Sequence, residues 1–144
     1  MKSILLIVLL ISICSCELNA RQEKSLNRAI LQYQNAYNKS LTLLEVSLTH
    51  PCVIEKYYQD SAQLRKNFIH QGSEIYNYNI ISVASNPEAM QVKIEFELSP
   101  NEVFDKKTLK KTMYAFSYDK GDSWYFIQAN LFGMRNCKHK PKKK

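Results

Sequence analysis

The chain has 144 residues, of which 45% are hydrophobic and 23% are charged, and its formal net charge is +7 at pH 7. These values are ordinary for a folded protein, and the length predicts a single domain. Five lysines stand in residues 138–144, a predicted disordered tail, so the rest of the chain is nearly neutral. A nucleic-acid-binding domain would carry basic residues on its fold, so we expect no nucleic-acid partner.

Residues 1–16 predict an export signal. Lys2 precedes a run of ten residues, 4–13, without a charge. A helix of this length spans about 15 Å, half of a bilayer's hydrocarbon core, so the run is too short to span a membrane and suits the core of a signal peptide. A buried helix of a cytosolic domain is the alternative, but the run lacks a polar face.

The end of this segment resembles the lipobox of bacterial lipoproteins. Ile13 stands three residues before Cys16, Ser15 stands directly before it, and Cys14 fills the middle position less typically. The resemblance implies that Cys16 is the mature N-terminus and carries lipid, including fatty acids such as palmitate. Glu17 at the next position then implies, in a cell that has an outer membrane, that the protein is anchored there and faces the periplasm. Ordinary signal cleavage, which releases a soluble secreted protein, is the alternative.

Two cysteines, Cys52 and Cys137, remain outside the signal. An even pair in an exported protein is a candidate disulfide, because the compartment is oxidising. Two separate thiols are the alternative. We expect residues 17–24 to form a polar tether and residues 25–137 to form the domain.

Apolar residues at steps of three and four predict one amphipathic helix over residues 26–48, packed on a core. Pro51 suits the first turn of a second helix, whose apolar residues continue to Ile69. Gly72 then predicts the end of that helix.

Four strands follow, over residues 75–84, 90–98, 108–118 and 123–131. The second alternates apolar and polar residues most clearly, which is typical of an antiparallel sheet with one buried face. The pair Ile80–Ile81 interrupts the alternation of the first strand and predicts a bulge. The third strand places two sets of side chains on opposite faces: Thr112, Tyr114, Phe116 and Tyr118 on one, and Lys111, Met113, Ala115 and Ser117 on the other.

Two helices followed by four strands predict an α+β fold, with the helices on one face of a four-stranded antiparallel meander sheet. The element order, the pairing of AMQVKIEFEL with TLKKTMYAFSYD and the closing DKGDSWYFI lie within residues 25–131. In these features the chain resembles the NTF2-like (cystatin-like) superfamily, particularly its small exported lipoproteins. The resemblance implies a curved sheet around a helix with a cavity between them. Such a fold serves both enzymes and binding modules.

The sequence offers little catalytic chemistry. His50 and His70 stand at predicted helix ends, which favours capping over catalysis. Glu95 and Glu97 lie on the polar side of the clearest strand, which favours a solvated surface. No side-chain spacing is typical of a metal site, a phosphate loop or a nucleophile, so we expect no metal, no cofactor and no catalytic residue.

Aromatic residues give the only candidate binding surface, because tyrosine joins apolar area to a polar tip. Ordinary packing on a half-buried sheet is the alternative. The candidates are Tyr76, Tyr78, Tyr114, Tyr118 and Trp124.

These observations predict a lipid-anchored protein of the cell envelope with a non-catalytic domain that binds a partner protein or a small apolar ligand. An NTF2-like cavity enzyme of the isomerase or dehydratase type is one alternative. An accessory component of an envelope secretion or conjugation machine, with the lysine tail as its contact, is another.

Overall fold

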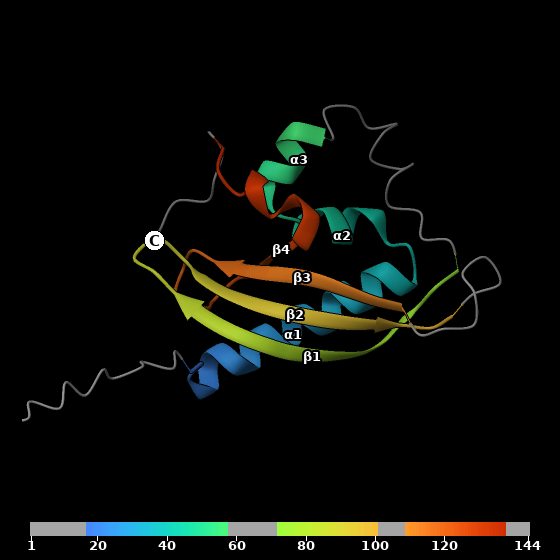
Figure 1. The fold of residues 1–144 in the computed structure, drawn as a ribbon, viewed down its shortest axis with the longest axis horizontal. Coiled ribbons are helices and arrows are strands. Elements are labelled where there is room, and N and C mark those ends of the chain that lie inside the picture. Colours follow the sequence, from blue (N-terminus) through green and yellow to red (C-terminus); the bar gives the residue numbers. More distant parts are fainter. Residues whose placement is uncertain (1–16, 58–71, 101–108, 138–144) are drawn as a thin grey trace, which may run out of the picture.

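The computed structural model describes residues 17–57, 72–100 and 109–137. Within these residues three α-helices precede four strands and a 3₁₀ helix (Figure 1). The strands form an antiparallel meander in the order β1-β2-β3-β4, which confirms the predicted α+β fold. The elements are α1 (Ala20–Asn38), α2 (Thr42–Leu48), α3 (Pro51–Tyr57), β1 (Ile75–Ser85), β2 (Met90–Leu98), β3 (Leu109–Ser117), β4 (Tyr125–Gln128) and η1 (Ala129–Met134).

The first helix begins earlier than the sequence pattern predicts. The Asn19 side chain accepts a hydrogen bond from the Gln22 N–H, and the Gln22 side chain accepts one from the Asn19 N–H, both at 3.0 Å. This reciprocal pair is a capping box, which satisfies backbone donors that a helix start otherwise leaves unpaired. The prediction of a tether over residues 17–24 is therefore wrong from Ala20 onward, where the chain is helical.

The predicted single helix over residues 26–48 is two helices, α1 and α2. The chain leaves α1 through Ser40, whose φ is +50°. The Leu41 N–H bonds to the Ala36 carbonyl at 2.8 Å, and the Ser40 N–H bonds to the Tyr37 carbonyl at 3.2 Å. These two bonds form a Schellman motif, which usually has glycine where this chain has Ser40. The next predicted helix starts at Pro51 as expected, and residues 58–71 lie outside the described part.

One face of the sheet packs on α1 to form the main core. β2 alternates between buried and partly buried residues along its whole length, as the sequence predicts. Its buried residues meet those of α1, β3 and β4, and the core includes Leu26, Ile30, Tyr33, Val92, Ile94, Phe96, Met113, Ala115, Trp124 and Phe126.

The opposite face of β3 and β4 is also covered, which differs from the predicted single helical layer. After α2, Thr49 forms a parallel bridge with Phe126, and the His50 N–H bonds to the Phe126 carbonyl at 2.9 Å. The chain thus passes the edge of β4, and α3 lies beyond it (Figure 1). Val53 of α3 then packs in a second core with Phe116, Tyr118 and Ile127.

The last strand is shorter than predicted. β4 ends at Gln128, and residues that the pattern assigns to its end form η1. Leu131 and Phe132 pack against the second core, so burial of these two side chains turns the chain back over the sheet. The predicted strand over residues 123–131 is therefore wrong at both ends.

Candidate functional site

Strand β1 lies at an edge of the sheet. Within the described residues β2 is its one strand neighbour, and eight of its eleven residues are exposed. An edge strand presents unpaired N–H and C=O groups to any extended chain that approaches it. Natural proteins usually protect such an edge with charged residues or proline, but Ile75–Ser85 contains neither. In the described residues the edge therefore has neither of these two protections, although its two register shifts, at Tyr76 and Ile81, are bulges of the kind that can also protect an edge.

Large apolar side chains are exposed along the same strand. The exposed fractions of Tyr76, Ile80 and Ile81 are 53%, 39% and 51%. Seven large apolar side chains are exposed in the described residues, and these three share one strand. A concentration of exposed apolar groups is typical of an interaction site, whereas scattered single ones are not.

A β-bulge shapes this surface. Ile80 pairs with Ile94 and Ser82 pairs with Lys93, so Ile81 has no register partner on β2. The bulge confirms the interruption predicted at Ile80–Ile81. Bulges bend a strand and change the direction of its side chains.

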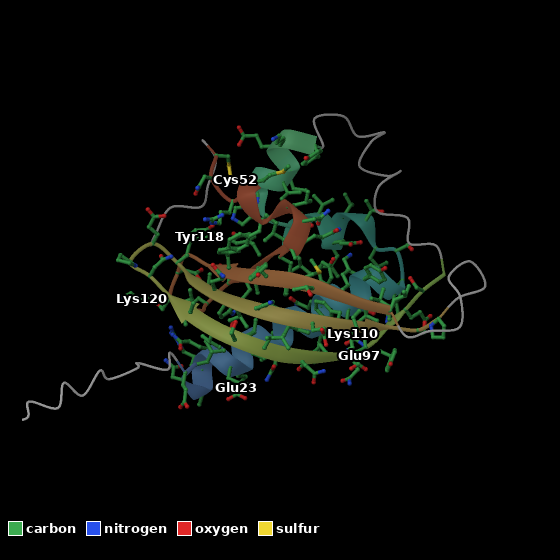
Figure 2. The ribbon with its side chains drawn as sticks, viewed as in Figure 1. Glu23, Cys52, Glu97, Lys110, Tyr118 and Lys120 are labelled. Carbon is green, nitrogen blue, oxygen red and sulfur yellow. A yellow bond between two sulfur atoms is a disulfide. The ribbon has the colours of Figure 1, made fainter. Side chains whose placement is uncertain are left out.

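The outer face of β1 and β2 next to this edge is polar. The Lys110 ammonium bonds to the Glu95 carboxylate at 2.8 Å, and this hydrogen bond raises the pKa of Lys110. The Asn77 and Asn79 amides donate to Glu97 at 3.4 and 3.5 Å. Figure 2 shows Glu97 and Lys110 toward the same end of the sheet. Glu95 and Glu97 thus join a cross-strand ladder, as their predicted surface role implies.

His50 caps a helix from a buried position, with none of its surface exposed. Its Nδ1 accepts the Cys52 N–H at 3.2 Å, so the ring proton is on Nε2, which lies 2.7 Å from the Tyr118 hydroxyl. Burial raises the pKa of Tyr118 to about 12, so the phenol stays protonated at neutral pH. This arrangement holds α3 against β3 and makes His50 structural. His70 lies outside the described residues.

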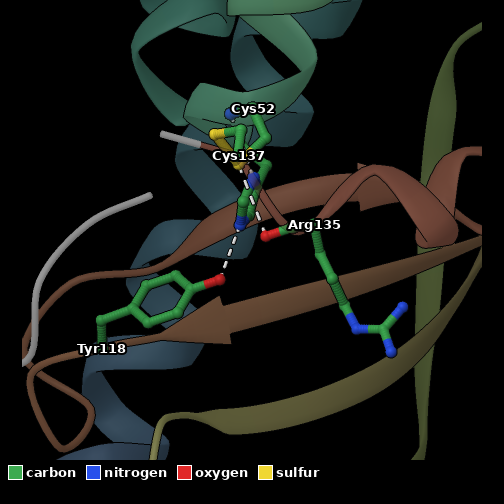
Figure 3. Close-up of a disulfide and its surroundings, with 5 residues drawn as sticks. Cys52, Tyr118, Arg135 and Cys137 are labelled. Atoms are coloured by element: carbon green, nitrogen blue, oxygen red, sulfur yellow. Dashed lines mark hydrogen bonds between the residues drawn. A yellow bond between two sulfur atoms is a disulfide. The ribbon is translucent and has the colours of Figure 1, made fainter. Parts of the chain in front are cut away.

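The structure joins Cys52 and Cys137 by a disulfide, which the sequence left open (Figure 3). Their Cα atoms are 5.4 Å apart, and 85 positions separate them in the chain. The Cys52 Sγ also lies 3.4 Å from the Arg135 carbonyl oxygen. The bridge fixes the segment after η1 to the start of α3, so it closes the second core.

The five predicted aromatic surface residues do not form one surface. Tyr118 and Trp124 are buried, with exposed fractions of 4% and 3%. The Tyr78 hydroxyl donates to the Asn27 side chain at 3.1 Å, and the ring of Tyr114 packs on Phe132 with centroids 4.4 Å apart. Only Tyr76 of this set is exposed. The alternation of residues along the strands could not show which of these aromatic side chains are exposed, because both faces of β3 and β4 are covered.

A polar group in the interior was not identified from the sequence. The Lys111 ammonium lies 5.1 Å from the centre of the Tyr37 ring, near Glu45, of which 2% is exposed. Burial lowers the pKa of Lys111, and the charge of Glu45 opposes this shift. The predicted strand alternation placed Lys111 on the same face as Met113 and Ala115, which belong to the main core. That shared face is the signal in the sequence that Lys111 lies on the core side of the sheet. The charge of the buried Glu45 thus partly offsets the cost of enclosing the half-buried Lys111.

In the described residues no cluster of three or more histidine, cysteine, aspartate or glutamate side chains could hold a metal ion. The helices described are all too short or too polar to cross a membrane. Cys16 and the tail over residues 138–144 lie outside the described part of the chain.

Comparisons of the chain with protein-family models, with curated proteins and with solved structures give no match. The similarity to the NTF2-like superfamily therefore stays a prediction.

Proposed function

We propose that this chain is a lipid-anchored protein of the cell envelope whose domain binds a partner protein at the edge of β1, without catalysing a reaction. The uncharged, exposed edge strand supports the proposal, since three large apolar side chains project from it. Strand addition supplies main-chain hydrogen bonds for affinity and side-chain contacts for specificity.

The chemistry of the edge describes the partner. Side chains of a strand alternate between the two faces, so the added segment needs apolar residues at alternate positions to cover Tyr76 and Ile80. It needs no charge directly opposite β1, because Ile75–Ser85 has none. An extended, largely uncharged segment of another envelope protein fits these requirements.

Two features support the envelope location. The lipobox-like Cys16 follows an export signal in the sequence. The Cys52–Cys137 disulfide is consistent with a protein outside the cytoplasm, because disulfides persist in oxidising compartments.

Photo-cross-linking in living cells tests the binding edge. A photoreactive amino acid replaces Ile81 in one variant and Leu31, which is 57% exposed on α1, in the matched control. We expect one discrete cross-linked partner from position 81 and none from position 31. A product with the mass of two copies of the chain, or equal products from both positions, would contradict the proposal.

A further inference from the structure

The chain between the proposed lipid and the folded domain is very short. Leu18 already packs against the main core, and Asn19 caps α1. Only Glu17 stands between Leu18 and Cys16. Two residues of extended chain reach at most about 7 Å, so a lipid on Cys16 would hold this end of the domain at the bilayer surface.

The end of the domain that carries Leu18 is firmly assembled. The Gln22 side-chain amide donates to the Lys120 carbonyl at 3.0 Å, and the Ser25 hydroxyl donates to the Asp122 carbonyl at 3.1 Å. Arg21 also forms an ion pair with Asp122 at 3.1 Å. Figure 2 shows Glu23 and Lys120 at this same end of the molecule. The start of α1 and the β3–β4 connection therefore form one rigid anchored end.

The edge strand β1 extends from the far end of the domain to this anchored end. α1 has nineteen residues, which corresponds to a length of about 28 Å. Near its far end the Asn38 side chain bonds to both the N–H and the carbonyl of Ile75, each at 2.8 Å. At the near end the Gln22 amide lies 3.4 Å from the Met90 sulfur, and Met90 pairs with Ser85. β1 thus begins at the far end and finishes at the anchored end.

We infer that the anchored end rests against the bilayer surface and that β1 stands upright, with Tyr76 farthest from the membrane. This inference rests on the lipid anchor of the proposed function. Among the described residues, charges of both signs occupy the anchored end, including Arg21, Glu23, Lys120 and Asp122. We therefore attribute the orientation to the short connection rather than to attraction to headgroups. Salt should therefore change the orientation little.

The orientation also bears on what covers β1. Antiparallel pairing of two β1 strands would turn one copy end over end. The two anchored ends would then lie at opposite ends of the dimer, and one bilayer surface could not hold both. A strand from another protein, which carries no such constraint, is the occupant that this geometry favours.

Energy transfer from the single tryptophan, Trp124, measures the distance to the membrane. The mature lipidated chain is reconstituted into phosphatidylcholine vesicles that carry a dansyl-labelled headgroup lipid. Trp124 lies two residues after Asp122, so we expect efficient transfer. A matched variant carries a glycine–serine linker of about 20 residues between Glu17 and Leu18, which spans about 25 Å on average and should lower the transfer by about half or more.

A further variant, compared with the chain that carries Trp124, tests the direction of β1. Tyr76→Trp in a Trp124→Phe background moves the tryptophan to the far end, and we expect weak transfer from it. Circular dichroism checks that this variant folds. The comparison of chains with and without the linker does not depend on this variant. Mass spectrometry of the N-terminus separates the outcomes. A chain without lipid overturns the anchor and the orientation together, whereas equal transfer in lipidated chains with and without the linker overturns the orientation alone.

Discussion

Removal of the Cys52–Cys137 bridge should cost a large part of the stability of this domain. The perturbation is the double substitution Cys52→Ser with Cys137→Ser, which leaves Cys16 intact. The two cysteines are 85 positions apart. A disulfide that closes so long a loop lowers the entropy of the unfolded chain, which corresponds to a stabilisation of about 4 to 5 kcal/mol at 25 °C. Small domains have total stabilities of about 5 to 15 kcal/mol, so the variant should be close to unfolding.

Native packing around the bridge acts in the same direction. The disulfide holds the segment after η1 against α3, and Val53, Leu131 and Phe132 pack over Phe116 in the second core. Without the bridge, this layer should open before the main core against α1. Local opening of this kind would appear as faster amide exchange in α3 than in β2.

The assay is equilibrium unfolding in urea, followed by the emission of Trp124. The oxidised protein should lose about 4 kcal/mol on reduction, and reductant should have no effect on the double variant. A loss below about 1 kcal/mol would contradict this expectation, because the bridge would then constrain neither the unfolded chain nor the second core.

Four further predictions concern packing, charge and the edge. Gly121→Ala should destabilise by about 1 to 2 kcal/mol in urea unfolding, since Gly121 has φ +94° and a Cβ would lie 2.6 Å from the Gln22 Cγ; Gly133→Ala, with open space, is the control and should change little. Burial alone would raise the pKa of Asp119, but hydrogen bonds led by Ser123 outweigh it and lower the value. Asp119→Asn should therefore lose stability above about pH 4 and match the wild type below the folded-state pKa; an equal difference at pH 7 and pH 2 would contradict this. Glu45→Gln and Lys111→Met should show a coupling of about 1 kcal/mol in a double-mutant cycle, and strict additivity would disprove their charge compensation. Ile81→Lys should abolish partner cross-linking from a photoreactive residue at position 80 without lowering the urea midpoint, whereas Leu31→Lys should leave it intact.

The strands were predictable where one face is buried and the other is wet. The alternation from Met90 to Leu98 shows which residues of β2 face the core. The bulge at Ile80–Ile81 is visible in the sequence as an interruption of the alternation between apolar and polar residues. The end of α1 was not predictable, because its Schellman turn uses Ser40 in place of the usual glycine. η1 also gave no local signal, since packing of Leu131 and Phe132 on the sheet decides its path.

The candidate site depends on facts that are not local in the sequence. The edge position of β1 follows from the order of strands, which no single segment encodes. Tyr118 and Trp124 are buried because covering layers lie on both faces of β3 and β4, whereas periodicity shows only that two faces exist. Tyr76 was among the predicted residues, but Ile80 and Ile81 were considered only for their bulge.

Fatty-acid labelling decides whether Cys16 carries a lipid anchor. Cells that express the wild-type chain, Cys16→Ala or the matched control Cys14→Ala are grown with a radioactive or clickable fatty acid. We expect label on the wild type and on Cys14→Ala, and none on Cys16→Ala. Equal label on Cys16→Ala, or an unlabelled wild-type chain that retains its initiator methionine, would contradict the lipid anchor.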